Sequence, residues 1–293
     1  MSKLYAIIAA VVASSTVMTS PAWADYVSDR EAAVALLRGG KAESAFAAFT
    51  KLAETAVSDY QKSDALEQAA LCADRLKQFD RALELAKKIP LPAYSKNCQM
   101  EILLSNGKRD EVVAKFKDED FTTWPESIRS QAYYLRGHAH HDAKQGAAAV
   151  HDLTQAVEFS TNSNTQGFCL NMIGDSYVNL LKDDAQALVA YRRTYQVGTI
   201  YKQCQAAISC SEILKRQQKF SAAVEEFNRL KLADIEAPVW HGRVLASWGE
   251  ALAAAGKPTE ARAKYEAALQ LEGLPENVKQ ACEQALEKLK TKS

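Results

Sequence analysis

The stretch Gly137-His138-Ala139-His140-His141-Asp142 brings together side chains that can bind metals or transfer protons. Three of the five histidines and one aspartate stand there within six residues. Neutral imidazoles and a carboxylate suit zinc or a similar ion. A metal site on one helix needs further ligands from elsewhere, and His151 and His241 lie on different expected elements. The stretch is therefore a metal site, a face that contacts a polypeptide, or an ordinary solvated surface.

Two other motifs could suggest catalysis. Residues 174–177 read Gly-Asp-Ser-Tyr, similar to the nucleophile motif of GDSL-type esterases. That chemistry needs the serine on a sharp turn after a strand, near a histidine and an oxyanion hole, whereas this tetrapeptide lies in a helical run. Residues 39–44, Gly-Gly-Lys-Ala-Glu-Ser, lack the upstream glycine and the Ser or Thr after lysine that a phosphate-binding loop requires. We expect no catalytic residue, no cofactor and no resident metal.

The first 24 residues are typical of a cleaved secretory signal. Lys3 is the charged start, residues 4–13 are the apolar run, and residues 22–24 are an Ala-Trp-Ala cleavage motif. The apolar run is much shorter than the roughly 20 residues of a membrane-spanning helix. No cysteine follows the motif, which disfavours lipid attachment. We expect a periplasmic protein that starts at Asp25 and has no membrane span in its mature chain, with secretion from the cell as the alternative.

The charge balance argues against a nucleic-acid partner. The chain has 36 basic and 36 acidic residues, and loss of Lys3 with the signal leaves a net charge of −1. A nucleic-acid binder needs a basic surplus, because its affinity rests on neutralising phosphates. Hydrophobic residues make up 47% of the chain, enough to bury a substantial core. We therefore expect a folded protein that does not bind nucleic acid.

A phrase with helical spacing recurs seven times along the chain. In each copy a small residue is followed four positions later by a large or aromatic one and then by another apolar residue, as on one face of an α-helix. Successive copies are 30–38 residues apart, the period of a helical repeat. Five copies are clear and two are weaker, and their first positions, the marker positions, are Ala45, Ala82, Val112, Ala149, Ala187, Ala223 and Ala261.

A second helix is expected upstream of each marker position. Gly137, Gly174 and Gly249 each stand on such a helix where two helices would need a close approach. We predict fourteen helices in seven antiparallel pairs over residues 25–274. A polar capping helix over residues 276–290 then closes the segment 275–293.

Two parts of the chain resemble the tetratricopeptide repeat (TPR) family. They are "AYYLRGHAHH" (132–141) followed by "AVHDLTQAVEF" (149–159), and "ASWGEALAAAGKPTEARAKYEAAL" (246–269). The resemblance extends over nearly all of the mature chain. It implies an all-α fold, a right-handed α-solenoid of about seven helix-turn-helix repeats, and a protein or peptide partner. It leaves the oligomeric state open.

Two repeats depart from the family pattern. Met100 and Val112 replace the usual small residues in the third repeat. The fifth repeat holds one extra residue between Gly174 and Ala187. These departures put the regularity of the solenoid in doubt more than the helix pairs.

In this family the first helix of each pair lines a concave groove, and the resemblance places the histidine-rich stretch there. Setting Gly137 at the close-packing position puts His138, His141 and Asp142 on the groove face and His140 towards the core. Such a polar surface suits hydrogen bonds and ion pairs with a polypeptide. The same register projects onto the groove Glu67, Asp74, Arg75, Asn97, Glu101, Gln131, Tyr134, Asn171, Asp175, Glu212, Lys215, Arg216, Arg243 and Glu250.

Six cysteines in an exported chain favour disulfides. Cys72 and Cys98 fall in the first helices of neighbouring predicted repeats, as do Cys169 and Cys204, so bridges would tie adjacent repeats together. The alternative is that the cysteines stay free and fill small positions in the core.

The preferred interpretation is a non-catalytic scaffold or adaptor of the cell envelope that binds a protein or peptide. His138 and His141, with ordinary pKa values near 6.5, could make binding sensitive to pH. The alternative is a periplasmic protein that binds a metal or small ligand through His138, His141 and Asp142. The residues expected to contact the partner are Gln131, Tyr134, His138, His141, Asp142, Asn171, Asp175, Lys215, Arg216 and Arg243.

Overall fold

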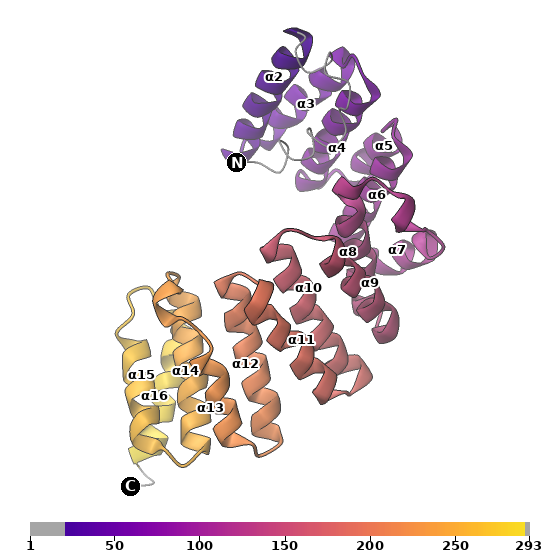
Figure 1. Ribbon diagram of the computed structural model, residues 1–293. Coiled ribbons are helices and arrows are strands. Elements are labelled where there is room, and N and C mark those ends of the chain that lie inside the picture. Colours follow the sequence, from indigo (N-terminus) through magenta and orange to yellow (C-terminus); the bar gives the residue numbers. More distant parts are fainter. Residues whose placement is uncertain (1–20, 291–293) are drawn as a thin grey trace. The chain divides into compact units, whose positions relative to one another are not determined.

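A computed structural model describes residues 21–290, and this part of the chain is α-helical without a strand (Figure 1). It divides into an N-terminal unit that ends at Ala143 and a C-terminal unit that begins at Lys144. Residues 1–20 of the expected signal lie outside the described residues. Residues 21–24 form the first turn of α2. None of the described helices combines the length and the apolar character needed to cross a membrane.

The N-terminal unit contains seven of the described helices and one 3₁₀ turn. They are α2 (Pro21–Arg38), α3 (Ala42–Thr55), α4 (Asp59–Arg75), α5 (Phe79–Lys87), α6 (Pro92–Ser105), α7 (Arg109–Phe116), η1 (Phe121–Thr123) and α8 (Glu126–Asp142). Within the unit, α2 packs on α3, α4 on α5, and α6 on α7. The first helices α4, α6 and α8 also pack side by side.

The C-terminal unit repeats this pattern. Its elements are α9 (Gly146–Phe159), α10 (Ser163–Ser176), η2 (Tyr177–Leu181), α11 (Asp184–Val197), α12 (Ile200–Arg216), α13 (Phe220–Asn228), η3 (Leu232–Asp234), α14 (Pro238–Ala254), α15 (Pro258–Leu269) and α16 (Glu276–Lys290). Helices α10 and α11, α12 and α13, and α14 and α15 pack as pairs. Helix α16 packs against α15 and α14, with Val278 and Cys282 buried in the same core.

The marker positions explain why the pairs form. All seven are 0% exposed, and they let neighbouring helices approach closely. Large side chains one turn later, such as Phe49 and Phe227, are also 0% exposed and fill the space between the helices. Burial of such a side chain contributes roughly 1.5–3 kcal/mol. The predicted all-α architecture of helix pairs is confirmed.

Close contact at glycine occurs at Gly174 and Gly249, two of the three positions where the spacing predicts it. A Cβ on Gly174 would lie 2.4 Å from Cε1 of Tyr191, and one on Gly249 would lie 2.7 Å from Cε1 of Tyr265. Each tyrosine stands four residues after a marker position, on the second helix of the pair. The ring therefore occupies the space that a side chain at the glycine of the first helix would need.

The turn inside each predicted pair has a repeated backbone conformation. A residue with φ between +58° and +75° stands five residues before every marker position. Such left-handed conformations cost about 1–2 kcal/mol for residues other than glycine. Three of these positions are glycine, namely Gly40, Gly107 and Gly256. The other four are Lys77, Lys144, Lys182 and Gln218.

The extra residue of the fifth repeat is absorbed within a helix. After Ser176 the chain continues as a π-helical turn over Tyr177–Leu181, which ends at Lys182 in the left-handed conformation. A π-turn accommodates one residue more than an α-turn without breaking the helix. The pair α10–α11 therefore forms in spite of the insertion.

Candidate binding face

Helix α8 carries the histidine-rich stretch. His138, His141 and Asp142 are half-buried, whereas His140 is only 9% exposed and lies in the helix packing. Gly137 is buried beside them. The stretch thus has one buried side and one solvent-facing side, in the register that the resemblance implies.

A series of polar contacts runs along the solvent-facing side of α8. The hydroxyl of Tyr134 lies 3.4 Å from Nδ1 of His138, and Nε2 of His138 lies 3.7 Å from Oδ2 of Asp142. Arg109 of α7 donates from Nε to the same oxygen of Asp142 at 2.5 Å. Burial lowers the pKa of His138, opposed by Asp142 and reinforced by His141 and Arg109. These surroundings therefore favour the neutral imidazole of His138.

This geometry does not support the metal-site alternative. The carboxylate of Asp142 is already paired with the guanidinium of Arg109, which competes with a metal ion for the same oxygens. Between residues 21 and 290, no three His, Cys, Asp or Glu side chains are arranged to hold a metal. The stretch offers hydrogen-bonding groups and one balanced ion pair.

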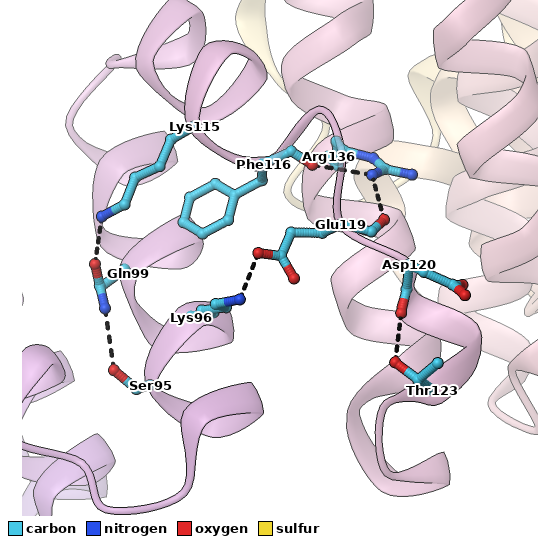
Figure 2. A network of polar contacts seen from close by, with 9 residues as sticks. All are labelled: Ser95, Lys96, Gln99, Lys115, Phe116, Glu119, Asp120, Thr123 and Arg136. Carbon is cyan, nitrogen blue, oxygen red and sulfur yellow. Dashed lines mark hydrogen bonds and ion pairs between the residues drawn. The ribbon is translucent and has the colours of Figure 1, made fainter.

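A buried network on α8 fixes the position of this face, and Figure 2 shows it. Nη1 of Arg136 donates to the carbonyl of Phe116 at 3.0 Å and to that of Glu119 at 2.9 Å. The guanidinium also lies 4.2 Å from the ring centre of Phe121. Lys96 of α6 pairs with the side chain of Glu119 (Figure 2). These contacts tie α8 to α6 and to the connection after α7, and so they hold the α8 register.

Hydrogen bonds also join the first helices to one another. Nε2 of Gln131 on α8 donates to Oε2 of Glu101 on α6 at 2.9 Å. Asp74 of α4 accepts from Oγ of Ser105 at 2.7 Å and from Nδ2 of Asn106 at 2.5 Å, at the end of α6. We call the following half-buried residues the N-terminal polar face: Glu67, Asp74, Glu101, Gln131, Tyr134, His138, His141 and Asp142.

Two carboxylates of the N-terminal polar face lie in unfavourable electrostatic surroundings. Burial raises the pKa of Glu67 to about 8, and the charges of Asp64 and Glu101 add to the rise while Arg30 opposes it. Burial also raises the pKa of Glu101, against the charge of Arg75, which is exposed at the end of α4. Arg30 donates to both oxygens of Asp64, at 2.6 and 3.0 Å, so its guanidinium is already engaged.

Asn97 of α6 is the least satisfied polar side chain of this region. It is 0% exposed, and neither Nδ2 nor Oδ1 finds a hydrogen-bond partner among the described residues. Such a buried, unsatisfied group costs roughly 1–3 kcal/mol. Glu101 stands one helical turn later on the same side of α6. Three residues before Asn97, the ring of Tyr94 meets that of Tyr60 on α4 edge to face, with 6.4 Å between centroids.

The sequence analysis missed part of this arrangement. Tyr60 and Asp64 share a side of α4 with Glu67, at intervals of four and three residues. The 3–4 spacing of the predicted groove residues, continued towards the starts of α4 and α6, also reaches Tyr60, Asp64 and Tyr94. It would therefore have predicted all three. The pairing of Arg109 with Asp142 gave no signal, because these residues are 33 positions apart in the chain.

In the C-terminal unit, two predicted contact residues are used within the fold. Asn171 is 2% exposed, donates to the carbonyl of Lys202 at 3.0 Å and accepts from Oγ1 of Thr194 at 3.1 Å. Asp175 accepts from the hydroxyl of Tyr191 at 2.6 Å. These side chains hold α10 to α11 and α12.

The charged residues of α12 and α14 remain more open. Nζ of Lys215 lies 2.9 Å from Oε2 of Glu250, and Nη2 of Arg216 lies 2.8 Å from Oδ1 of Asp184 at the start of α11. Two more predicted residues of these helices are exposed, Glu212 and Arg243. The set forms a charged surface of mixed sign within the C-terminal unit.

The serine of the esterase-like motif is not a nucleophile. Ser176 is the last residue of α10 and is 0% exposed. Its hydroxyl donates to the carbonyl of Met172 at 2.8 Å, one turn back in the same helix. A nucleophilic serine needs an exposed position on a sharp turn, and this one lies inside a helix.

The expected disulfides are absent. All six cysteines are free, and each is buried. Cys72 and Cys98 are 0% exposed within the core of the N-terminal unit, and Cys169 and Cys204 are 0% exposed in the C-terminal unit. Burial raises the pKa of Cys169 to about 12, which suppresses the thiolate needed for disulfide exchange. The cysteines serve as small core side chains, the alternative given above.

Comparisons with known proteins agree with this architecture. No family model and no curated protein matches the sequence. Among solved structures, the apo form of RapI gives a TM-score of 0.60 at 10% identity over 91% of this chain and 86% of that chain. The C-terminal part of a TPR repeat-containing protein from Cytophaga hutchinsonii gives 0.57 at 14% identity over 86% and 98%. The apo quorum sensor NprR from B. thuringiensis gives 0.50 at 12% identity over 89% and 68%.

At such low identities, likeness of structure shows a shared fold and leaves function open. The chain has the helix-pair fold of TPR proteins. The resemblance found in residues 132–159 and 246–269 predicted that fold.

Proposed function

We propose that this chain is a non-catalytic scaffold that binds a protein or peptide partner through polar side chains on the first helices of its pairs. The main observation is the hydrogen-bonded series along α4, α6 and α8. Asp74, Glu101, Gln131, His138 and Asp142 are half-buried and each is held by a neighbour. Side chains that are already ordered lose little entropy on binding, which favours association.

Each unit has a binding surface of its own. The N-terminal unit offers the N-terminal polar face. The C-terminal unit offers the charged surface of α12 and α14, where Arg243 is exposed and where a partner would share or replace the ion pairs of Lys215 and Arg216. Asn171 and Asp175 support this second surface by holding α10 in place.

The proposed site of action is the periplasm. This part of the proposal rests on the signal-like pattern of the first 24 residues. Fractionation of cells followed by intact-mass measurement tests it. A periplasmic product that begins at Asp25 is expected, and a full-length product in the cytoplasm would contradict it.

In-cell crosslinking followed by mass spectrometry tests the binding function. The wild-type chain is compared with the triple variant His138→Ala, His141→Ala and Asp142→Ala, checked for folding by circular dichroism. The matched control changes His151 and Glu158, which are exposed on α9, to alanine. Loss of one dominant partner from the triple variant alone is expected. Retention of that partner would move binding away from the N-terminal polar face.

A further inference from the structure

Two helix sides meet in the N-terminal unit and bring polar and aromatic groups together. Tyr60 and Glu67 share one side of α4, and Tyr94, Asn97 and Glu101 share one side of α6. The edge-to-face contact of the two tyrosine rings sets these sides against each other. Glu67 and Glu101 each stand seven residues after one of these tyrosines on the same side of its helix, and the charge of Glu101 helps to raise the pKa of Glu67, as expected for neighbouring carboxylates. We call these five residues the α4–α6 cluster.

No member of the α4–α6 cluster is basic, although the charges of Arg30 and of exposed Arg75 reach its carboxylates. Glu67 makes no hydrogen bond or ion pair within residues 21–290, and Glu101 accepts a hydrogen bond from the neutral amide of Gln131. Arg30 faces the cluster from α2 but is engaged by both oxygens of Asp64. Two carboxylates near each other in partly buried surroundings favour a bound cation, since opposite charge stabilises the ionised form.

Asn97 provides an independent indication of a ligand. It lies between Tyr94 and Glu101 on the same side of α6, fully buried, with its carbonyl oxygen and its amide nitrogen both unsatisfied. Native proteins rarely leave such groups without a partner. An ammonium group has three donors, and the two carboxylates and the Asn97 carbonyl are three acceptors. The tyrosine rings add aromatic surface, which also attracts cations.

We propose that the α4–α6 cluster is a recognition site for a cationic side chain, lysine or arginine, of the polypeptide that the scaffold binds. The inference rests on the proposed function and narrows the class of partner to a basic one. In the proposed complex, half-buried Glu67 and Glu101 pair with the cation, and the carbonyl oxygen of Asn97 accepts one of its hydrogen bonds. The arrangement is that of an amine or guanidinium site, since no described group of residues is arranged for a metal.

Fluorescence anisotropy with labelled peptides tests this proposal on the full chain. The probes are three eight-residue peptides with glycine and serine spacers, carrying three lysines, three arginines or three acetyllysines. The test variant is Glu67→Gln with Glu101→Gln, which keeps the shapes and removes both charges. The control variant is Glu43→Gln with Glu54→Gln, an equal change of net charge on the exposed side of α3.

The wild type and the control are expected to bind the lysine and arginine peptides at least tenfold more tightly than the acetyllysine peptide. The test variant is expected to lose this preference. Equal binding of charged and acetylated peptides by the wild type would overturn the proposal. An equal loss in the control would also overturn it, because the effect would then be one of overall charge.

A second variant separates the two proposals. Asn97→Leu is expected to keep the fold and to weaken lysine-peptide binding at least fivefold. If all peptides bind equally well and the His138→Ala, His141→Ala, Asp142→Ala variant loses them, peptide binding stands and the cation site is refuted. If no peptide binds and crosslinking finds no partner at the N-terminal polar face, both proposals fail.

Discussion

The two units differ in whether their buried and half-buried carboxylates have hydrogen-bond and ion-pair partners. In the C-terminal unit, Glu226 is 1% exposed and is held by Arg192 at 2.5 Å, Arg229 at 3.2 Å and the hydroxyl of Tyr195 at 3.3 Å. In the N-terminal unit, half-buried Glu67 has no such partner within residues 21–143. Glu226 and its partners are part of the fold, whereas half-buried Glu67 is the carboxylate for which we propose a cation from a partner.

Asparagine shows the same contrast. Asn171 is satisfied by Thr194 and by the backbone of Lys202, whereas neither amide atom of Asn97 has a partner among residues 21–290. The C-terminal unit has exceptions of its own in Ser211 and Trp248, but each is a single neutral donor without a partner. In the described part of the N-terminal unit, by contrast, both polar atoms of one amide, Asn97, are buried without a partner.

The largest effect on stability is expected at Glu226, the carboxylate of the C-terminal unit that has several partners. Glu226→Ala leaves two guanidinium groups and a hydroxyl without their acceptor and is expected to lower the free energy of unfolding by about 3 kcal/mol. Urea denaturation followed by circular dichroism measures it. Glu225→Ala, on the exposed side of the same helix, is the control and should change stability by less than about 0.5 kcal/mol. Equal effects of the two would show that the partners of Glu226 do not matter.

The next prediction concerns Asn97, the unsatisfied amide of the N-terminal unit. Asn97→Leu removes two buried polar atoms that have no partner and is expected to raise the free energy of unfolding by about 1–2 kcal/mol. The matched change Asn171→Leu breaks two hydrogen bonds and should be destabilising by a similar amount. Urea denaturation of both variants checks the opposite signs. Destabilisation by Asn97→Leu would mean that the amide is satisfied in solution.

The free energy of unfolding is expected to depend on pH through the protonation of Glu67. The pKa of Glu67 is raised to about 8 by burial, so the folded protein binds a proton that the unfolded chain releases above its ordinary pKa of 4.5. Stability contributed by this protonation is present at pH 4.5 and is lost as pH rises through 8. The melting temperature of wild type is expected to fall by about 2–4 °C relative to Glu67→Gln between pH 5 and 8.5. Parallel melting curves would contradict the raised pKa.

The smallest effect concerns the turns rather than the binding residues. Lys77 and Gln218, one in each unit, have φ values of 62° and 58°, which glycine adopts without strain. Lys77→Gly and Gln218→Gly are each expected to stabilise the protein by about 0.5–1 kcal/mol, after allowing for the more flexible unfolded chain. Chemical denaturation measures both. The reverse change Gly40→Lys should cost a similar amount.

The helix pairs could be predicted because their cause is local and periodic. Small residues at the marker positions and large ones a turn later leave a clear pattern, and all seven markers are buried. The register on α8 was predictable for the same reason, since one glycine sets which of the histidines faces solvent. In the sequence, the only sign of the turn at Lys182 and of the π-turn before it is one extra residue in the fifth repeat.

The electrostatics could not be predicted in this way. Whether Glu67 has a cation beside it depends on Arg30, which is distant in sequence and engaged by Asp64. The burial of Asn97 depends on how closely α6 packs between α4 and α8. Cysteine count and compartment favoured disulfides, but the depth at which Cys72 and Cys98 are buried was not readable from their spacing.

The most direct test of the cation site is the affinity for the three-lysine peptide at pH 6 and at pH 9, measured for wild type and Glu67→Gln. Lysine, with an ordinary pKa near 10.4, remains charged at both pH values. Glu67 is mostly protonated at pH 6 and mostly ionised at pH 9. Wild type is expected to bind at least fivefold more tightly at pH 9, and Glu67→Gln to show no such gain. The same gain in both proteins, or none in either, would contradict a cation site at Glu67.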